Sequence, residues 1–129
     1  MITLPIYYTH KVKGKQKTIL VGMNAYERMF YIPRNKMKKH FYSLIRVTAR
    51  QLKPIKGMVA THYTVFYKNK ASDAPNIVAV IDKMLMDALQ ENGVIEQDNV
   101  QNYVRSSWEV GGVDKDNPRI EIKIFEVVD

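Results

Sequence analysis

Five polar side chains beyond residue 72 have the types and spacing that phosphodiester chemistry requires. Asn76, Lys83 and Asp87 are separated by seven and four residues, so on a helix they lie along one polar line. Asp73 stands just before this segment and Asp98 follows it. Mg²⁺ prefers oxygen ligands, and a lysine neutralises charge that develops on a phosphate. If the returning chain places Asp98 beside Asp73, these residues form a candidate metal-dependent hydrolytic site.

The same residues also allow a purely structural interpretation. Asp73 suits the N-cap position of a helix, because its side-chain oxygens can accept hydrogen bonds from backbone N–H groups. Lys83 and Asp87 have the i,i+4 spacing of an exposed ion pair. Asp98 is then an ordinary loop acid. The spacing alone does not decide between this interpretation and the catalytic one.

Basic residues are concentrated in the first part of the chain. Residues 1–56 contain thirteen Lys and Arg and one acid, whereas residues 73–129 contain five Lys and Arg and twelve acids, within a net charge of +7. A cationic segment of this density favours an anionic partner such as nucleic acid. The residues expected to contact phosphates surround a turn at Gly14 and the helix that follows: Lys11, Lys13, Lys15, Lys17, Arg34, Lys36, Lys38, Lys39, Arg46 and Arg50.

Composition excludes several other classes of protein. The 129 residues are 46% hydrophobic and 26% charged, which predicts one globular domain over residues 1–129. Because the chain has no cysteine, disulfides, thiolate catalysis and zinc–cysteine sites are excluded. No segment approaches the ~18 apolar residues of a membrane span, and the N-terminal residues lack the order of a secretory signal. We therefore expect no membrane association and a cytoplasmic location.

Hydrophobic periodicity predicts the elements that position these residues. Strands are expected at 2–8, 18–23, 58–67, 100–110 and 119–128, and helices at 35–52 and 76–91. The segment 24–33 is expected to be irregular. The turn-forming segment 111–118 is expected to close a hairpin between the last two strands. The predicted fold class is α+β: a mixed β-sheet with two helices in the order β-β-α-β-α-β-β.

These motifs together resemble the RusA family of Holliday junction resolvases, small homodimeric endonucleases of phages and prophages. The most specific part comprises Lys83-Met84-Leu85-Met86-Asp87-Ala88-Leu89, Gly93 and Glu96-Gln97-Asp98-Asn99. Ser72-Asp73-Ala74-Pro75-Asn76 is similar to the family's acidic D-x-D-N segment. The resemblance extends more weakly to Leu4-Pro5, Asn24-Ala25-Tyr26, Lys38, Phe41 and Tyr42, so it spans nearly the whole chain.

The resemblance implies a structure-selective DNA endonuclease that resolves four-way junctions by paired nicking in recombination and repair of phage-type DNA. It implies Mg²⁺ as cofactor, with Mn²⁺ possible, branched DNA as substrate, a homodimer, and the cytoplasm of a bacterium or phage-infected host. Asp73 and Asp98 match metal-binding acids, Lys83 matches the catalytic lysine, and Asp87 matches the family's helical Asp. Asn76 is a candidate further metal ligand.

Two positions depart from the family pattern. Pro75 stands where the second Asp of D-x-D-N belongs, and Gln97 stands where the first acid of the later pair often lies. Fewer carboxylates predict weaker metal binding, or a substitute ligand from Asn76, Glu96 or Asp87. This departure motivates a second hypothesis, a non-catalytic protein of the same fold that binds branched DNA or RNA. A third hypothesis is a phage accessory protein that binds another protein through its basic face.

The aromatic residues of the first half allow two interpretations as well. Tyr26, Phe30 and Tyr31 either stack on exposed bases near a branch point or belong to the core. Trp108 is expected in the core or in a dimer interface. His62, within a predicted strand, is expected to be a half-buried residue with satisfied hydrogen bonds.

Overall fold

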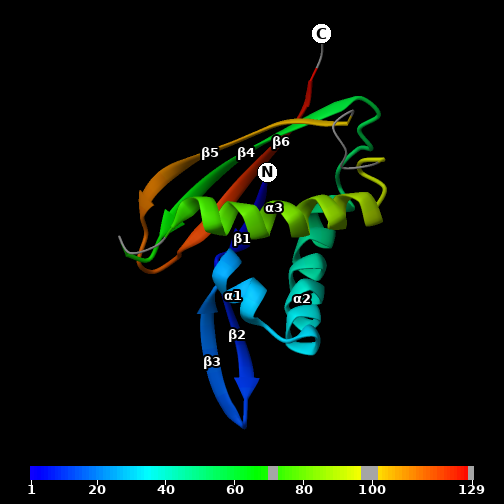
Figure 1. The fold of residues 1–129 in the computed structure, drawn as a ribbon. Coiled ribbons are helices and arrows are strands. Elements are labelled where there is room, and N and C mark those ends of the chain that lie inside the picture. The colour runs from blue at the N-terminus through cyan, green and yellow to red at the C-terminus, as the bar shows by residue number, and fades with distance from the viewer. Residues whose placement is uncertain (70–72, 97–101, 128–129) are drawn as a thin grey trace.

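The computed structural model describes residues 1–69, 73–96 and 102–127, and within them it shows a mixed α+β fold (Figure 1). The strands are β1 (Ile2–Pro5), β2 (Tyr7–Val12), β3 (Lys15–Leu20), β4 (Met58–Tyr67), β5 (Tyr103–Val113) and β6 (Arg119–Val127). The helices are α1 (Met23–Arg28), α2 (Tyr31–Ala49) and α3 (Ala74–Glu91). The predicted α+β class with a mixed sheet is confirmed, whereas the predicted element order is wrong because the chain has one helix and one strand more than expected.

The main sheet has the strand order β1-β6-β4-β5. Its central strand β4 pairs antiparallel with β6 and parallel with β5. The predicted hairpin between the last two strands is therefore wrong, because β4 lies between them. The segment 111–118 has the residues of a turn, but turn chemistry does not determine which strands become neighbours. The apolar, β-branched β4 takes the central position, where a strand is paired on both sides.

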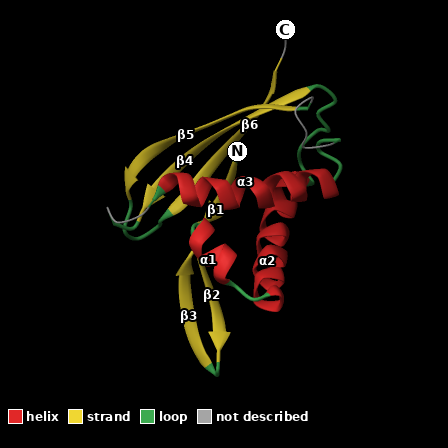
Figure 2. Cartoon of the chain, in the orientation of Figure 1, coloured by secondary structure: helices red, strands yellow, loops and turns green. Residues whose placement is uncertain are grey.

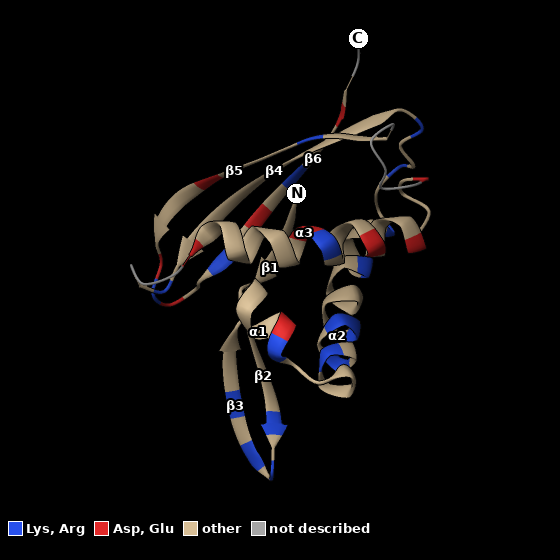
Figure 3. Cartoon of the chain, in the orientation of Figure 1, with Lys and Arg blue, Asp and Glu red and all other residues tan. Residues whose placement is uncertain are grey.

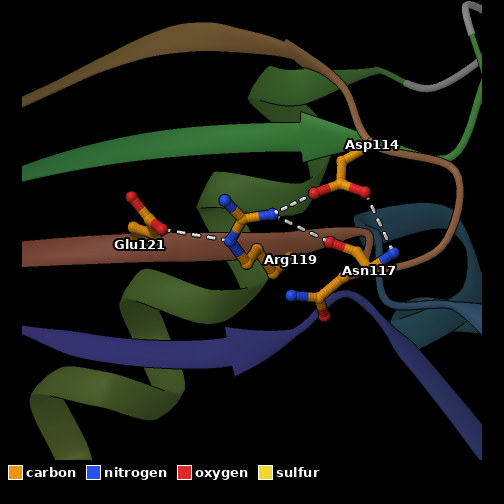
Figure 4. Close-up of polar contacts among 4 residues, drawn as sticks. All are labelled: Asp114, Asn117, Arg119 and Glu121. Carbon is orange, nitrogen blue, oxygen red and sulfur yellow. Dashed lines mark hydrogen bonds and ion pairs between the residues drawn. The ribbon is translucent and has the colours of Figure 1, made fainter.

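Arg119 holds the connection between β5 and β6 in place (Figure 4). Its guanidinium donates to Asp114 at 2.7 Å, to Glu121 at 3.0 Å and to the backbone oxygen of Asn117 at 3.0 Å. The same group lies 3.9 Å from the ring centroid of Phe66 on β4. These contacts hold the β5–β6 connection against β4.

The helix α3 lies across one face of the main sheet (Figure 2), and α2 packs against α3 and β1; both helices contribute to the core. The apolar residues of α3 that recur with helical periodicity share one face, and every one of them is buried: Ile77, Ile81, Met84, Leu85, Ala88 and Leu89. On α2, Met37, Phe41 and Ile45 are buried. None of the helices in the described part of the chain is long and apolar enough to cross a membrane.

The strands β2 and β3 form a separate hairpin that projects away from the main sheet (Figure 1). Its turn is Lys13-Gly14, and both residues have positive φ, 51° and 79°, as a two-residue type I′ turn requires. The strand predicted at 2–8 is instead divided at Ile6, whose backbone oxygen accepts a hydrogen bond from Val21. The basic turn around Gly14 is confirmed, but the strand predicted at 18–23 lies three residues earlier, at Lys15–Leu20.

The segment 24–33 is not irregular but forms α1 and the beginning of α2. With six residues, α1 is too short to show helical periodicity, and its buried Tyr26 holds it against the core. Pro33 and Pro75 lie in the first turns of α2 and α3, where a missing N–H removes no helical hydrogen bond. This is why both helices begin earlier than predicted. The predicted end of α3 at residue 91 is confirmed, with Asn92 as the C-cap and Gly93 in a positive-φ conformation.

Asp82 connects α3 to the sheet. Its carboxylate accepts hydrogen bonds from the hydroxyl groups of Tyr63 on β4 and Tyr103 on β5, the latter at 2.5 Å. Thr61 extends the network, with its hydroxyl 2.5 Å from that of Tyr103. Burial, and then the nearby carboxylate, raise the pKa of Tyr63, and burial also raises the pKa of Tyr103. Both tyrosines therefore stay protonated and act as donors.

We expect Asp82→Ala to lower the free energy of unfolding by about 1–3 kcal/mol, because the hydroxyl groups of Tyr63 and Tyr103 lose their charged acceptor. Urea denaturation followed by circular dichroism measures this change. Asp116→Ala removes an exposed acid from the β5–β6 connection and serves as the control, with an expected change within about 0.5 kcal/mol. Equal stability of the two variants would contradict this role of Asp82.

Candidate functional site

The beginning of α3 brings Asp73 and Asn76 together. Asp73 is the N-cap residue, but its carboxylate makes no capping hydrogen bond to the backbone. Instead it accepts a hydrogen bond from the side-chain amide of Asn76 at 2.8 Å. Asp73 is exposed to solvent. The pair thus presents carboxylate and amide oxygens at one accessible point, which is the donor chemistry that Mg²⁺ prefers.

This pair lies in the wall of a cavity of about 460 Å³ between the beginning of α3, α1 and the end of β3. Arg28 on α1 contributes the positive charge in that wall, and Asn24 contributes a further amide. A carboxylate, two amides and a guanidinium around one cavity suit a ligand that has both phosphate groups and a bound cation.

Lys83 and Arg34 meet at the ring of Tyr26. The Lys83 ammonium lies 5.4 Å from the ring centroid, and the Arg34 guanidinium carbon lies 5.0 Å from it. Arg34 also donates to the backbone oxygen of Met29 at 2.9 Å, while its buried Nε has no hydrogen-bond partner in the described structure. Neither cation forms an ion pair with a described acid. Two such cations around one buried tyrosine favour an anion at this place.

Lys83 and Asp87 lie further along α3 than the Asp73–Asn76 pair. The helical rise separates Asp73 from Lys83 by about 15 Å and from Asp87 by about 21 Å along the axis. The Tyr42 hydroxyl on α2 donates to Asp87 at 3.3 Å. Burial, and then the charge of Asp87, raise the pKa of Tyr42 to about 12, so it remains a donor at neutral pH. Within the described chain, Lys83 and Asp87 do not form the exposed ion pair.

Asp98 lies outside the described residues, as does Gln97. Asn102, four residues beyond Asp98, accepts a hydrogen bond from the Val59 N–H at 2.5 Å, at the beginning of β4. Asp73 follows the opposite end of that strand. Asn102 therefore gives no sign that the chain returns toward Asp73. The place of Asp98 in the site stays a prediction. In the ranges that are described, no group of three or more His, Asp or Glu residues forms a metal-binding cluster.

A groove lined by cations runs from the Asp73–Asn76 pair along the β2–β3 hairpin. The cavity at the pair shares Ile19, Ala25 and Arg28 with a second cavity of about 390 Å³. The second cavity shares His10, Val12 and Pro33 with a third of about 490 Å³. We call these three adjoining cavities, which share wall residues, the hairpin groove. Its walls are the helix-facing side of the hairpin and the helices α1 and α2.

The hairpin groove contains four of the ten residues predicted to contact phosphates. Figure 3 shows Lys and Arg gathered on the hairpin and α2. The groove is lined by Lys11, Lys13, Lys17, Lys36 and, on α1, Arg28. Lys15 is exposed beside the turn. Lys39 and Arg46 instead line a separate cavity of about 450 Å³. Arg34 is half-buried and contacts Tyr26 and Met29, outside the three cavities of the groove.

The sequence interpretation missed a polar row across β4 and β5. His62 lies 2.7 Å from the Ser107 hydroxyl through Nδ1 and 3.0 Å from the Glu109 carboxylate through Nε2. These residue types can form a hydrolytic triad, but here they lie on the open, water-exposed face of the sheet. Cross-strand hydrogen bonding explains the row, and the prediction that His62 is a half-buried, satisfied residue is confirmed.

The fold and the groove define a class of protein: an α+β domain whose cation-lined groove ends at a carboxylate–amide pair. Comparison with models of known protein families gives no match to this chain, and comparison with curated proteins gives none either. The assignment of a function therefore depends on the chemistry of the groove.

Proposed function

We propose that this chain is a structure-selective, divalent-metal-dependent DNA endonuclease of the RusA type that resolves four-way junctions by paired nicking. The hairpin groove carries this proposal, because its cationic walls lead to Asp73 and Asn76. Basic walls attract a phosphate backbone without reading its sequence. A carboxylate at the end of such a groove would repel the same backbone unless a cation lies between them, so the charge pattern favours a bound metal ion.

Asp73 and Asn76 are the residues that would hold Mg²⁺ or Mn²⁺, with Asp98 proposed as the second carboxylate. When bound, the metal ion supplies an activated water and stabilises the leaving oxygen. Lys83, together with Arg34, neutralises backbone charge beside Tyr26. Because Lys83 lies about 15 Å further along the helix, we assign it to a different phosphate of the bound strand from the one at Asp73.

The proposal is tested with a synthetic four-way junction whose strands are labelled one at a time. We expect symmetric nicks in two opposing strands with Mg²⁺ or Mn²⁺, and none with EDTA or on a linear duplex of equal length. Absence of nicking under every divalent metal ion, in a preparation that binds the junction, would contradict the endonuclease assignment.

The second candidate is a non-catalytic protein that binds branched DNA or RNA. It is favoured by Pro75, which supplies no side-chain ligand where the family has an acid, and by Asp73 being the one carboxylate that the described residues place in the groove. This candidate predicts salt-sensitive junction binding without nicks. It also predicts that Asp73→Asn leaves the junction affinity unchanged and that divalent metal ions have no effect.

The homodimer that we propose for this function uses the edge strand β5, which pairs with β4 on one side only among the described strands. Trp108, expected in the core or in a dimer interface, is 46% exposed on this strand. If two β5 strands pair antiparallel about Ser107, Arg105 faces the partner's Glu109 and Val104 faces the partner's Val110. The strand is thus self-complementary in charge and in hydrophobicity, which favours a second copy of this chain.

We expect Glu109→Arg to weaken dimerisation by roughly tenfold or more. Because the two-fold axis repeats the contact, the substitution converts two pairs of opposite charge into two pairs of like charge. Sedimentation equilibrium measures the dissociation constant. Adding Arg105→Glu exchanges the two charges and restores both attractive pairs. A double variant that dimerises no better than Glu109→Arg alone would contradict this interface.

A further inference from the structure

Three consecutive apolar side chains project into solvent where α1 joins α2. Phe30 is 84% exposed, Tyr31 76% and Ile32 67%. We call Phe30 and Tyr31 the aromatic tip. A run of exposed large apolar residues is unfavourable in a folded protein unless it binds something. By contrast Tyr26, the third aromatic residue of this segment, is buried in the core.

The backbone of the aromatic tip is held by secondary structure. Phe30 is the N-cap of α2, and its backbone oxygen accepts a hydrogen bond from the Arg34 N–H at 3.0 Å. Met29, just before it, packs against the core and accepts a hydrogen bond from the Arg34 side chain. The two rings therefore project from a fixed support, and ordering them on a ligand costs little conformational entropy.

The surroundings of the aromatic tip are positively charged. Phe30 lines the hairpin groove in the cavity that also contains Lys17 and Arg28, and Ile32 lines the cavity that contains Lys11 and Lys36. No Asp or Glu from the described part of the chain lines either cavity. A ligand for this place must have both flat apolar surfaces and negative charge. A second copy of the tip lacks the negative charge, so two tips would repel each other.

We infer that the aromatic tip stacks on unpaired nucleobases of a strand whose phosphates lie in the hairpin groove. This inference depends on the proposed function only in that the ligand is a nucleic acid. In a duplex the base faces are already stacked, so the tip would bind at a branch point or on a single strand. Every base has an aromatic face, so the contact selects the structure of the DNA and not its sequence.

The test measures affinity by fluorescence anisotropy, in EDTA, for three labelled probes: a four-way junction, a single strand and a duplex. For Phe30→Ala and Tyr31→Ala we expect affinity for the junction and the single strand to fall roughly 5- to 100-fold per stacked base, with duplex affinity changed less than twofold. The salt dependence of binding stays unchanged, since no charge is removed. Equal losses on all three probes, or no loss, would overturn the inference.

Two further variants separate stacking from other effects. Tyr31→Trp keeps a stacking surface, so we expect it to retain wild-type affinity and its added tryptophan emission to be quenched by the single strand. Phe125→Ala removes an exposed ring from β6 that does not line the groove, and should leave all three affinities unchanged. If the tip variants instead alter the oligomeric state in sedimentation, the tip is a protein contact and the inference is wrong.

The readout is binding without metal, so this inference and the endonuclease proposal fail separately. A selective loss of junction and single-strand binding supports the aromatic tip even if no strand is ever nicked. Normal selectivity in the tip variants, alongside metal-dependent nicking by the wild-type chain, overturns the tip alone.

Discussion

Asp73→Asn is expected to reduce junction nicking by at least about 100-fold while leaving junction affinity within a few-fold of the wild type. Asparagine keeps the size of the side chain and an oxygen acceptor for Asn76, but it removes the negative charge that holds a divalent ion. Loss of a metal ligand acts on the chemical step, whereas binding to the groove depends on the lysines and arginines. Single-turnover nicking and anisotropy measure the two effects separately.

Asp116→Asn is the matched control for this prediction. It makes the same chemical change at an exposed acid in the β5–β6 connection, outside the groove. We expect wild-type nicking from this variant. If Asp73→Asn nicks the junction as fast as Asp116→Asn does, Asp73 is not part of a catalytic centre.

Replacing the four lysines that line the hairpin groove should abolish most of the affinity for DNA. The variant combines Lys11→Ala, Lys13→Ala, Lys17→Ala and Lys36→Ala. Each phosphate contact contributes about 0.9 to the slope of log affinity against log salt, so four contacts predict a slope smaller by about 3.6. If both proteins bind equally at about 1 M salt, this slope difference corresponds at about 0.1 M salt to an affinity loss on the order of 4,000-fold.

The control for the groove variant removes the same number of charges elsewhere. Lys53, Lys56, Lys115 and Lys123 are exposed and lie outside the hairpin groove. Their combined replacement by alanine lowers the net charge equally, and we expect it to change the slope by less than one unit. Equal slopes for both variants would mean that overall charge, and not the groove, attracts DNA.

The elements with regular hydrophobic patterns were predictable from the sequence. β4 has the bounds expected for residues 58–67, and the buried face of α3 is the one that a 100° periodicity selects. The pairing of the strands was not predictable in the same way. β5 and β6 both pair with β4 and not with each other, although a turn segment joins them. Such pairing depends on which strand is best buried, and no local pattern contains that information.

Only the part of the candidate site that is formed by residues close together in the sequence was predictable. Asp73 and Asn76 are three residues apart at a helix start, and the structure joins them by a hydrogen bond. The meeting of Lys83 with Arg34 at Tyr26 was not predictable, because it depends on α1, a six-residue helix without periodicity. Asp98 remains a prediction, since it lies outside the described residues.

The central claim is that the cation-lined groove ends at a divalent-metal site. Titration of the protein with Mn²⁺, followed by the electron paramagnetic resonance signal of the free ion, tests this most directly. We predict that the wild-type chain takes up Mn²⁺, that Mg²⁺ displaces it, and that Asp73→Asn weakens uptake at least about tenfold. Uptake by Asp73→Asn equal to that of the wild type, or no uptake by either, would contradict the account.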